Sequence, residues 1–139
     1  MITMHPTDFS SPADTSLLLS LLTTGQRPSL MVLCGRRKPE AVVESLTTLC
    51  GPPVHRRHLP GQLRLPQTKH GTLVLADAST LTLVQQIELY DWLNASRGLV
   101  QVVSVTSQPI WPLVEEGRFL EGLFYRLNVV TLEASQERF

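Results

Sequence analysis

The sequence has few cysteines and no long hydrophobic run, and both absences narrow what the chain can be. Its 139 residues include two cysteines, Cys34 and Cys50, too few for the disulfide framework of a small secreted domain. The apolar runs at 17–22 and 30–34 are far shorter than the roughly 20 residues of a membrane-spanning helix. The amino terminus lacks the basic start and apolar stretch of a signal peptide. We therefore expect a cytoplasmic protein with reduced thiols and no membrane contact.

Net charge is absent too, because twelve Lys and Arg balance twelve Asp and Glu. This balance disfavours a protein that binds nucleic acid through bulk charge, so we expect no direct DNA binding. Apolar residues make up 42% of the chain and charged residues 17%, which suits a hydrophobic core and argues against global disorder. The length fits one domain. We expect a polar tail over residues 1–10 and a single domain over residues 11–139.

Hydrophobic periodicity predicts helices alternating with strands. Apolar runs predict strands at 30–34, 72–75, 100–105 and 128–132, with a short edge strand near 54–58. Helical spacing predicts helices over 12–24, 40–49, 82–94, 113–116 and 119–126. The prolines and glycines of residues 50–70 indicate that this interval is mostly loop. The alternation implies an α/β fold with three layers and a parallel sheet of about five strands.

One long segment is specific enough to indicate a family. Residues 114–130 read VEEGRFLEGLFYRLNVV, and GTLVL stands at 71–75. The long segment resembles the pattern V-x-E-G-R-F-R-x-D-L-Y-Y-R-L-N-V-V of the ATPase domain in sigma-54-dependent transcription activators, a branch of the AAA+ superfamily. GTLVL resembles the strand before that family's acidic pair, and 102–107 resembles its sensor strand. The resemblance extends over about residues 11–132 and implies a P-loop NTPase core, here a degenerate AAA+-like domain without the helical lid.

The loop where this family would bind phosphate departs from the family's pattern. A P-loop, G-x-x-x-x-G-K-[ST], wraps phosphates in backbone N–H groups and brings a lysine to the terminal ones. Here the loop reads GRRKPE at residues 35–40, which keeps the first glycine alone. Pro39 also removes one N–H donor. We therefore expect no cofactor, with weak binding of ATP left open as an alternative.

The other positions that carry ATP hydrolysis in this family have changed as well. The Asp-Glu pair that holds magnesium and orients water is Ala76-Asp77, and the sensor Asn is Ser107. Of the two arginines that reach a neighbouring subunit, one is Leu120 and the other survives as Arg126. We predict no catalytic residue and no metal, and hence no enzyme. The degenerate nucleotide site implied by the resemblance consists of Gly35, Arg36, Arg37, Lys38, Asp77 and Ser107, with Arg126 as the finger-like residue.

Two other patterns have simpler readings. His55 and His58 are three residues apart, but a closed zinc site needs four ligands, so exposed loop histidines are the better interpretation. Arg56-Arg57 could form a basic patch for phosphate or an acidic partner, although such charges usually just solvate a loop.

The functional hypotheses follow from what is kept and what is missing. Nothing between 51 and 71 resembles the G-A-F-T-G-A loop with which this family contacts sigma factor. The lid and a DNA-binding helix pair are missing too, so we expect a shortened paralogue or a fragment of a larger regulator. The leading hypothesis is a non-catalytic interaction module whose partner is a sigma-54 activator or another transcription-regulatory protein, with a weak homo-oligomer also open. The alternatives are a nucleotide or anion sensor without hydrolysis, and an evolutionary remnant.

Overall fold

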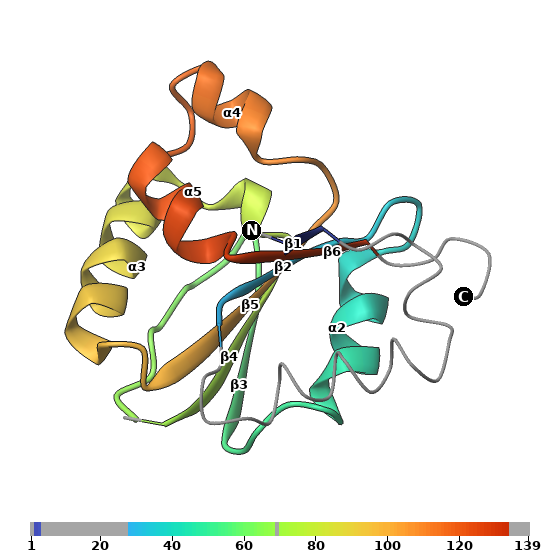
Figure 1. Cartoon of the computed structure of the whole chain (residues 1–139), viewed down its shortest axis with the longest axis vertical. Coiled ribbons are helices and arrows are strands. Elements are labelled where there is room, and N and C mark those ends of the chain that lie inside the picture. The colour runs from blue at the N-terminus through green and yellow to red at the C-terminus, as the bar shows by residue number, and fades with distance from the viewer. Residues whose placement is uncertain (1, 4–27, 69, 134–139) are drawn as a thin grey trace.

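The computed structural model describes residues 2–3, 28–68 and 70–133, which form a parallel sheet with helices on both faces (Figure 1). The strands are β1 (Ile2–Thr3), β2 (Leu30–Leu33), β3 (Val54–His58), β4 (Gly71–Ala76), β5 (Val100–Thr106) and β6 (Val130–Glu133). Their order across the sheet is β1-β6-β2-β5-β4-β3, and every neighbouring pair is parallel. The helices are α2 (Pro39–Thr47), η2 (Ala78–Thr80, a 3-10 turn), α3 (Leu83–Ser96), α4 (Trp111–Glu115) and α5 (Glu121–Leu127).

The predicted three-layer fold is confirmed, with one addition to the sheet. Ile2 and Thr3 pair in parallel with Val130 and Thr131, so two residues of the expected polar tail form a sixth strand. Two residues are too few to show an alternating pattern, which is why the sequence gives no sign of this strand. The predicted helix over 12–24 lies outside the described residues.

The two faces of the sheet bury separate clusters of apolar side chains. On one face α2 packs Val42, Val43 and Leu46 against β2, β4 and β5. On the other face α3, α4 and α5 bury a larger cluster that includes Leu89, Leu123 and Leu127 (Figure 1). β4 and β5 are buried along their whole length, as expected of parallel strands covered on both sides.

The helix α3 begins with a complete capping box but does not bury the face that its apolar residues suggest. The Thr82 hydroxyl accepts from the Gln85 N–H, and the Gln85 side chain accepts from the Thr82 N–H. Leu83, Val84 and Ile87 are among the apolar residues that mark this helix in the sequence, yet all three are exposed. The buried positions are Gln86, Leu89 and Leu93. Periodicity therefore located the helix but not its inward face.

The hydrogen bonds of Gln86 explain why this glutamine, and not the neighbouring apolar residues, faces inward. Its buried side chain joins α3 to the segment before α5. Its Nε2 donates to the carbonyls of Leu81 and Arg118, each at 3.1 Å, and its Oε1 accepts from the Leu120 N–H at 2.8 Å. A fully buried amide needs such partners, since unsatisfied polar groups are costly in a core. This junction fixes where the family-like segment 114–130 lies on the sheet.

No helix connects β3 to β4 within the described residues, and a clamped loop covers this part of the sheet. The Arg57 guanidinium donates to the Leu63 carbonyl at 2.7 Å and to the Arg64 carbonyl at 2.6 Å. Leu63 is buried against the α3 side of the sheet. Arg57 therefore holds a loop, and it is not available for the basic patch that the sequence suggested.

Candidate functional site

The predicted nucleotide-site residues follow three neighbouring strands at their carboxyl ends. Gly35–Lys38 follow β2, Asp77 follows β4 and Ser107 follows β5. β5 pairs with both β2 and β4, so the three connections meet at one edge of the sheet. Open α/β sheets bind their ligands at this end. The structure thus brings together the six residues grouped from the sequence.

The loop between β2 and α2 closes on itself as a tight turn. The Arg37 N–H donates to the Cys34 carbonyl at 2.9 Å, and Gly35 has a φ of +57° that suits glycine. The Cys34 N–H donates across to the Thr106 carbonyl at 3.0 Å. Because the Arg37 N–H is bonded and Pro39 has no N–H, two of the six residues 35–40 offer no backbone donor to a phosphate nest.

The start of α2 places the wrong side chains where a P-loop would act. Counting from Gly35, the second glycine, the lysine and the Ser or Thr of the motif fall at Glu40, Ala41 and Val42. Glu40 lies exposed in the first turn, where its negative charge suits the helix dipole and opposes a bound anion. Val42 is 2% exposed in the core, so no magnesium ligand stands there.

Asp77 is held by two serines in a strained backbone conformation. Its φ of 65° and ψ of 57° are left-handed, which is uncommon for a residue other than glycine. Its Oδ1 accepts from the hydroxyls of Ser79 and Ser107, both at 2.9 Å. Sequence reasoning missed Ser79, although Asp-x-Ser is a common local hydrogen-bonding pattern. This carboxylate ties β4 to β5 across the site.

The charges around Cys34 complete the electrostatics of the site. Burial raises the pKa of the Cys34 thiol, Asp77 and Glu40 raise it further, and a backbone hydrogen bond and Arg37 oppose them. Partial burial lowers the pKa of the Arg37 guanidinium. The thiol donates to the Thr106 carbonyl at 3.1 Å. It is therefore a neutral, buried group with no nucleophilic character.

Arg126 does not join this site. Its Nη1 donates to the Asn94 side-chain oxygen, near the carboxyl end of α3. That end of α3 leads into the start of β5, so Arg126 lies at the opposite end of the sheet from Asp77. Arg126 therefore takes no part in the group of residues around Asp77 and Ser107 of its own chain.

The described part of the chain holds no metal-binding cluster and no membrane-spanning helix. His55 and His58 lie on β3 rather than in a loop, and their odd spacing points them to opposite faces of the strand. Within residues 28–68 and 70–133, no group of three or more His, Cys, Asp or Glu could hold a metal ion. In the same residues no helix is long and apolar enough to cross a membrane.

Comparison with known proteins identifies the family. The family model described as the sigma-54 interaction domain matches residues 44–136. The chain belongs to the sigma-54 interaction domain family. The match includes the carboxyl-end residues Asp77 and Ser107 and the segment 114–130, and it begins after the loop that follows β2.

Relatives and solved structures agree with this membership. The pathogenicity-locus probable regulatory protein HrpR of Pseudomonas syringae pv. syringae is 39% identical over an alignment of 75 residues, and the match covers 45% of this chain and 24% of HrpR. NtrX from Brucella abortus in complex with ADP superposes with a TM-score of 0.64 at 19% identity, over 91% of this chain and 36% of NtrX. The P-loop NTPase domain of the E. coli sigma-54 transport activator gives 0.60 at 14% identity, over 88% of this chain and 95% of that domain.

These matches differ in what they show and in how much of each relative they cover. The two structural likenesses show the shared P-loop NTPase fold, since their identities are low. The chain spans about a quarter of HrpR and about a third of NtrX. The chain thus corresponds to a sigma-54 interaction domain with the AAA+ core fold. HrpR and NtrX are longer proteins, of which it matches a part.

Proposed function

We propose that this sigma-54 interaction domain is a non-catalytic module of transcription regulation, which acts by contacting a protein partner and does not hydrolyse ATP. The observation that carries the proposal is the start of α2, where Glu40, Ala41 and buried Val42 stand in place of the glycine, lysine and hydroxyl of a P-loop. Backbone cradle, phosphate lysine and magnesium ligand act together, and losing all three removes the means to position a triphosphate.

Exposed apolar side chains support the contact with a partner. Trp111, Tyr125 and Val129 are 39%, 53% and 44% exposed, and the three belong to α4, α5 and the residue before β6. The Trp111 and Tyr125 rings lie 6.2 Å apart, with Phe124 5.4 Å from each. Aromatic side chains of this kind are enriched in protein interfaces. The partner we propose is the AAA+ domain of a sigma-54 activator.

The test measures ATP turnover alone and in a mixture. The purified chain should hydrolyse no ATP above a blank, and it should change the ATPase rate of an activator AAA+ domain when titrated into it. Tyr125→Ser should weaken that change. Leu99→Ser is the matched control, because Leu99 is 56% exposed and belongs to neither α4, α5 nor the residue before β6. Turnover by the chain itself would refute the non-catalytic part. An unaltered activator rate at saturating chain would refute the contact.

The second candidate, an anion sensor, is favoured by one observation. Arg36, Arg37 and Lys38 put three consecutive cations beside the turn after β2. Calorimetric titration with ATP, with and without magnesium, tests this candidate. Binding that Lys38→Ala abolishes would favour the sensor, and the absence of heat at millimolar ATP would exclude it.

A further inference from the structure

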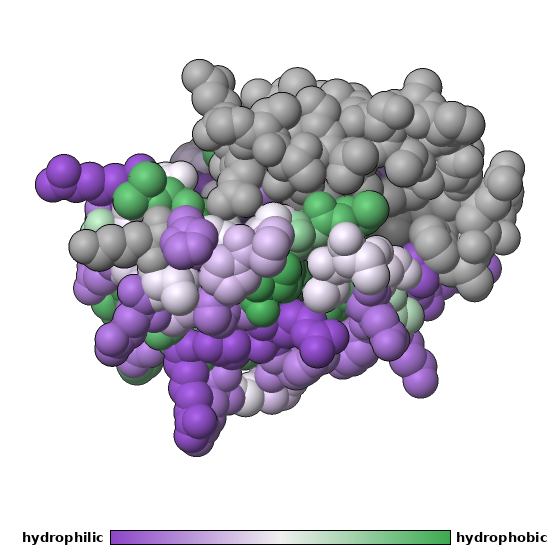
Figure 2. Space-filling model, turned by 90° about the horizontal axis from the view of Figure 1, so that it is seen from below, coloured by the Kyte–Doolittle hydropathy of each residue, from purple (hydrophilic) through white to green (hydrophobic). Residues whose placement is uncertain are grey.

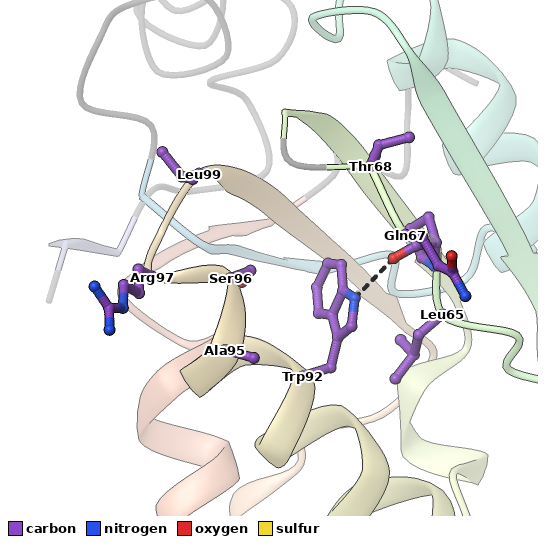
Figure 3. Close-up of a pocket in the computed structure, with 9 residues that line it drawn as sticks. Leu65, Gln67, Thr68, Trp92, Ala95, Ser96, Arg97 and Leu99 are labelled. Carbon is purple, nitrogen blue, oxygen red and sulfur yellow. Dashed lines mark hydrogen bonds between the residues drawn. The ribbon is translucent and has the colours of Figure 1, made fainter.

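A cavity lies at the end of the sheet opposite to the candidate site. It has a volume of about 560 Å³ and is formed between the last turn of α3, the residues before β5 and the loop segment 65–68. Trp92, Ser96, Arg97 and Leu99 line one side, and Leu65 and Thr68 line the other (Figure 3). Cavities of this size hold small organic ligands.

The walls of this cavity are fixed by hydrogen bonds before any ligand arrives. The Trp92 indole Nε1 donates to the Pro66 carbonyl at 2.8 Å, so the indole links α3 to the loop (Figure 3). The Ser96 hydroxyl donates to the Leu93 carbonyl at 3.1 Å, and the Leu99 N–H donates to the Ser96 carbonyl at 3.0 Å. A pre-formed wall spares a ligand the cost of ordering the protein.

The lining combines apolar surface with one positive charge. Trp92 is half-buried, so part of its ring faces the cavity, and the 56% exposed Leu99 adds an apolar side chain at the mouth. Arg97 is the single formally charged residue of the nine that line the cavity, and it is exposed at the rim. The opposite rim carries the Thr68 hydroxyl (Figure 3). The charge therefore favours an anion, and the walls favour a flat apolar body.

We propose that this cavity binds a small planar aromatic carboxylate. The ring lies against the Trp92 indole and Leu99, and the carboxylate faces the Arg97 guanidinium, whose exposed side chain is free to turn toward it. The Thr68 and Ser96 hydroxyls already donate to the carbonyls of His70 and Leu93, so the contact with the carboxylate comes from Arg97. This inference goes beyond the proposed function, since it concerns the other end of the sheet and needs neither a partner nor a nucleotide.

The test follows the indole signals of the chain's two tryptophans by NMR while 2-naphthoate is added. Trp111→Phe assigns the signals. We expect the Trp92 indole signal to shift saturably, with a dissociation constant of about 1 mM or below for a ligand of this size. The Trp111 signal should stay in place. If naphthoate leaves the Trp92 signal unmoved at 5 mM (about five times that constant), the proposal is wrong.

Two variants and one neutral ligand test the chemistry. Arg97→Gln should weaken naphthoate binding about fivefold, the usual effect of one exposed charge pair. The matched control, Arg118→Gln, removes an exposed arginine far from the cavity and should change nothing. 2-Naphthalenemethanol should bind less tightly than naphthoate and be insensitive to Arg97→Gln. Equal affinity for both ligands would overturn the carboxylate part. Ala95→Phe should fill the cavity and abolish binding, and undiminished binding would place the ligand elsewhere.

Discussion

The layer formed by α3, α4 and α5 keeps the sequence pattern of the family, whereas the carboxyl end of the sheet keeps only the arrangement of the strands. In the layer, the segment 114–130 keeps nearly the whole family pattern, and its Phe119, Leu123 and Leu127 are buried. At the carboxyl end, the loop after β2 and the residue Ala76 depart from the family pattern, yet the strands still align in register. Side chains at loop ends contribute little to packing, so changes at these positions leave the fold intact.

The polar groups at the carboxyl end also differ from the exposed side chains of the layer. Where a nucleotide site keeps its polar groups open to a ligand, here they bond to one another. Asp77 accepts from Ser79 and Ser107, and the Arg37 N–H bonds to Cys34. Figure 2 shows hydrophobic surface as separate patches among hydrophilic residues on the face seen from below. Asp77 and Ser107 thus bond within the candidate site, Arg36 and Lys38 stay exposed there, and the layer exposes Trp111 and Tyr125.

The largest effect we predict is on the layer. Leu123→Ala removes a fully buried side chain from α5 and should lower the free energy of unfolding by about 3 kcal/mol, because the cavity left behind cannot collapse completely. Urea unfolding measures this loss. Val129→Ala, at a 44% exposed position, should cost under about 0.5 kcal/mol. A cost below about 1 kcal/mol for Leu123→Ala would mean that α5 is not packed as described.

The junction at Gln86 should show the next largest effect. Gln86→Leu keeps the volume but leaves the carbonyls of Leu81 and Arg118 and the Leu120 N–H without their partner. The bond to Leu81 is buried, and the bonds to Arg118 and Leu120 are part-buried, where water can replace the amide. We therefore expect a loss of about 2 kcal/mol, within the range of about 1–3 kcal/mol for one unsatisfied buried group. Gln67→Leu, at an exposed position, is the matched control. If both variants unfold at the same urea concentration, the junction does not stabilise the layer.

The sequence predicts some of these packing elements and not others. Strands β2 to β6 and α2 were predicted to within a few residues, because apolar runs and the inward Val42, Val43 and Leu46 follow from periodicity. The inward face of α3 was not, since a buried glutamine is favoured only by partners from residues 118–120, far along the chain. The Arg57 clamp depends in the same way on carbonyls whose position no pattern encodes. At the site, the resemblance named six residues that follow neighbouring strands, but the Ser79 bond to Asp77 became visible only in three dimensions.

Alkaline pH should have a smaller effect, and it should come from the carboxyl end. Burial raises the pKa of Cys34 in the folded state, so the unfolded chain loses its thiol proton at lower pH than the folded chain does. The stability is complete below the unfolded pKa and declines as the pH rises toward the folded one. The maximum slope for one proton is about 1.4 kcal/mol per pH unit. Between pH 7 and 10, the free energy of unfolding should fall less steeply with pH for Cys34→Ala than for the native chain. An identical slope in the two proteins would contradict the raised pKa of Cys34.

The smallest effect should come from the residues that would do chemistry in an active relative. Lys38→Ala removes an exposed side chain, so it should change the free energy of unfolding by under about 0.5 kcal/mol. Asp77→Asn keeps an oxygen that accepts from Ser79 and Ser107, and asparagine tolerates the left-handed backbone at this position. Its effect should be of the same size. Asp77→Val removes the acceptor and places a β-branched residue at a φ of 65°, so it should cost at least about 1 kcal/mol. If Asp77→Asn proved as costly as Asp77→Val, the charge itself would be needed, which would indicate that the carboxyl end binds a cation and would count against a purely structural role of Asp77.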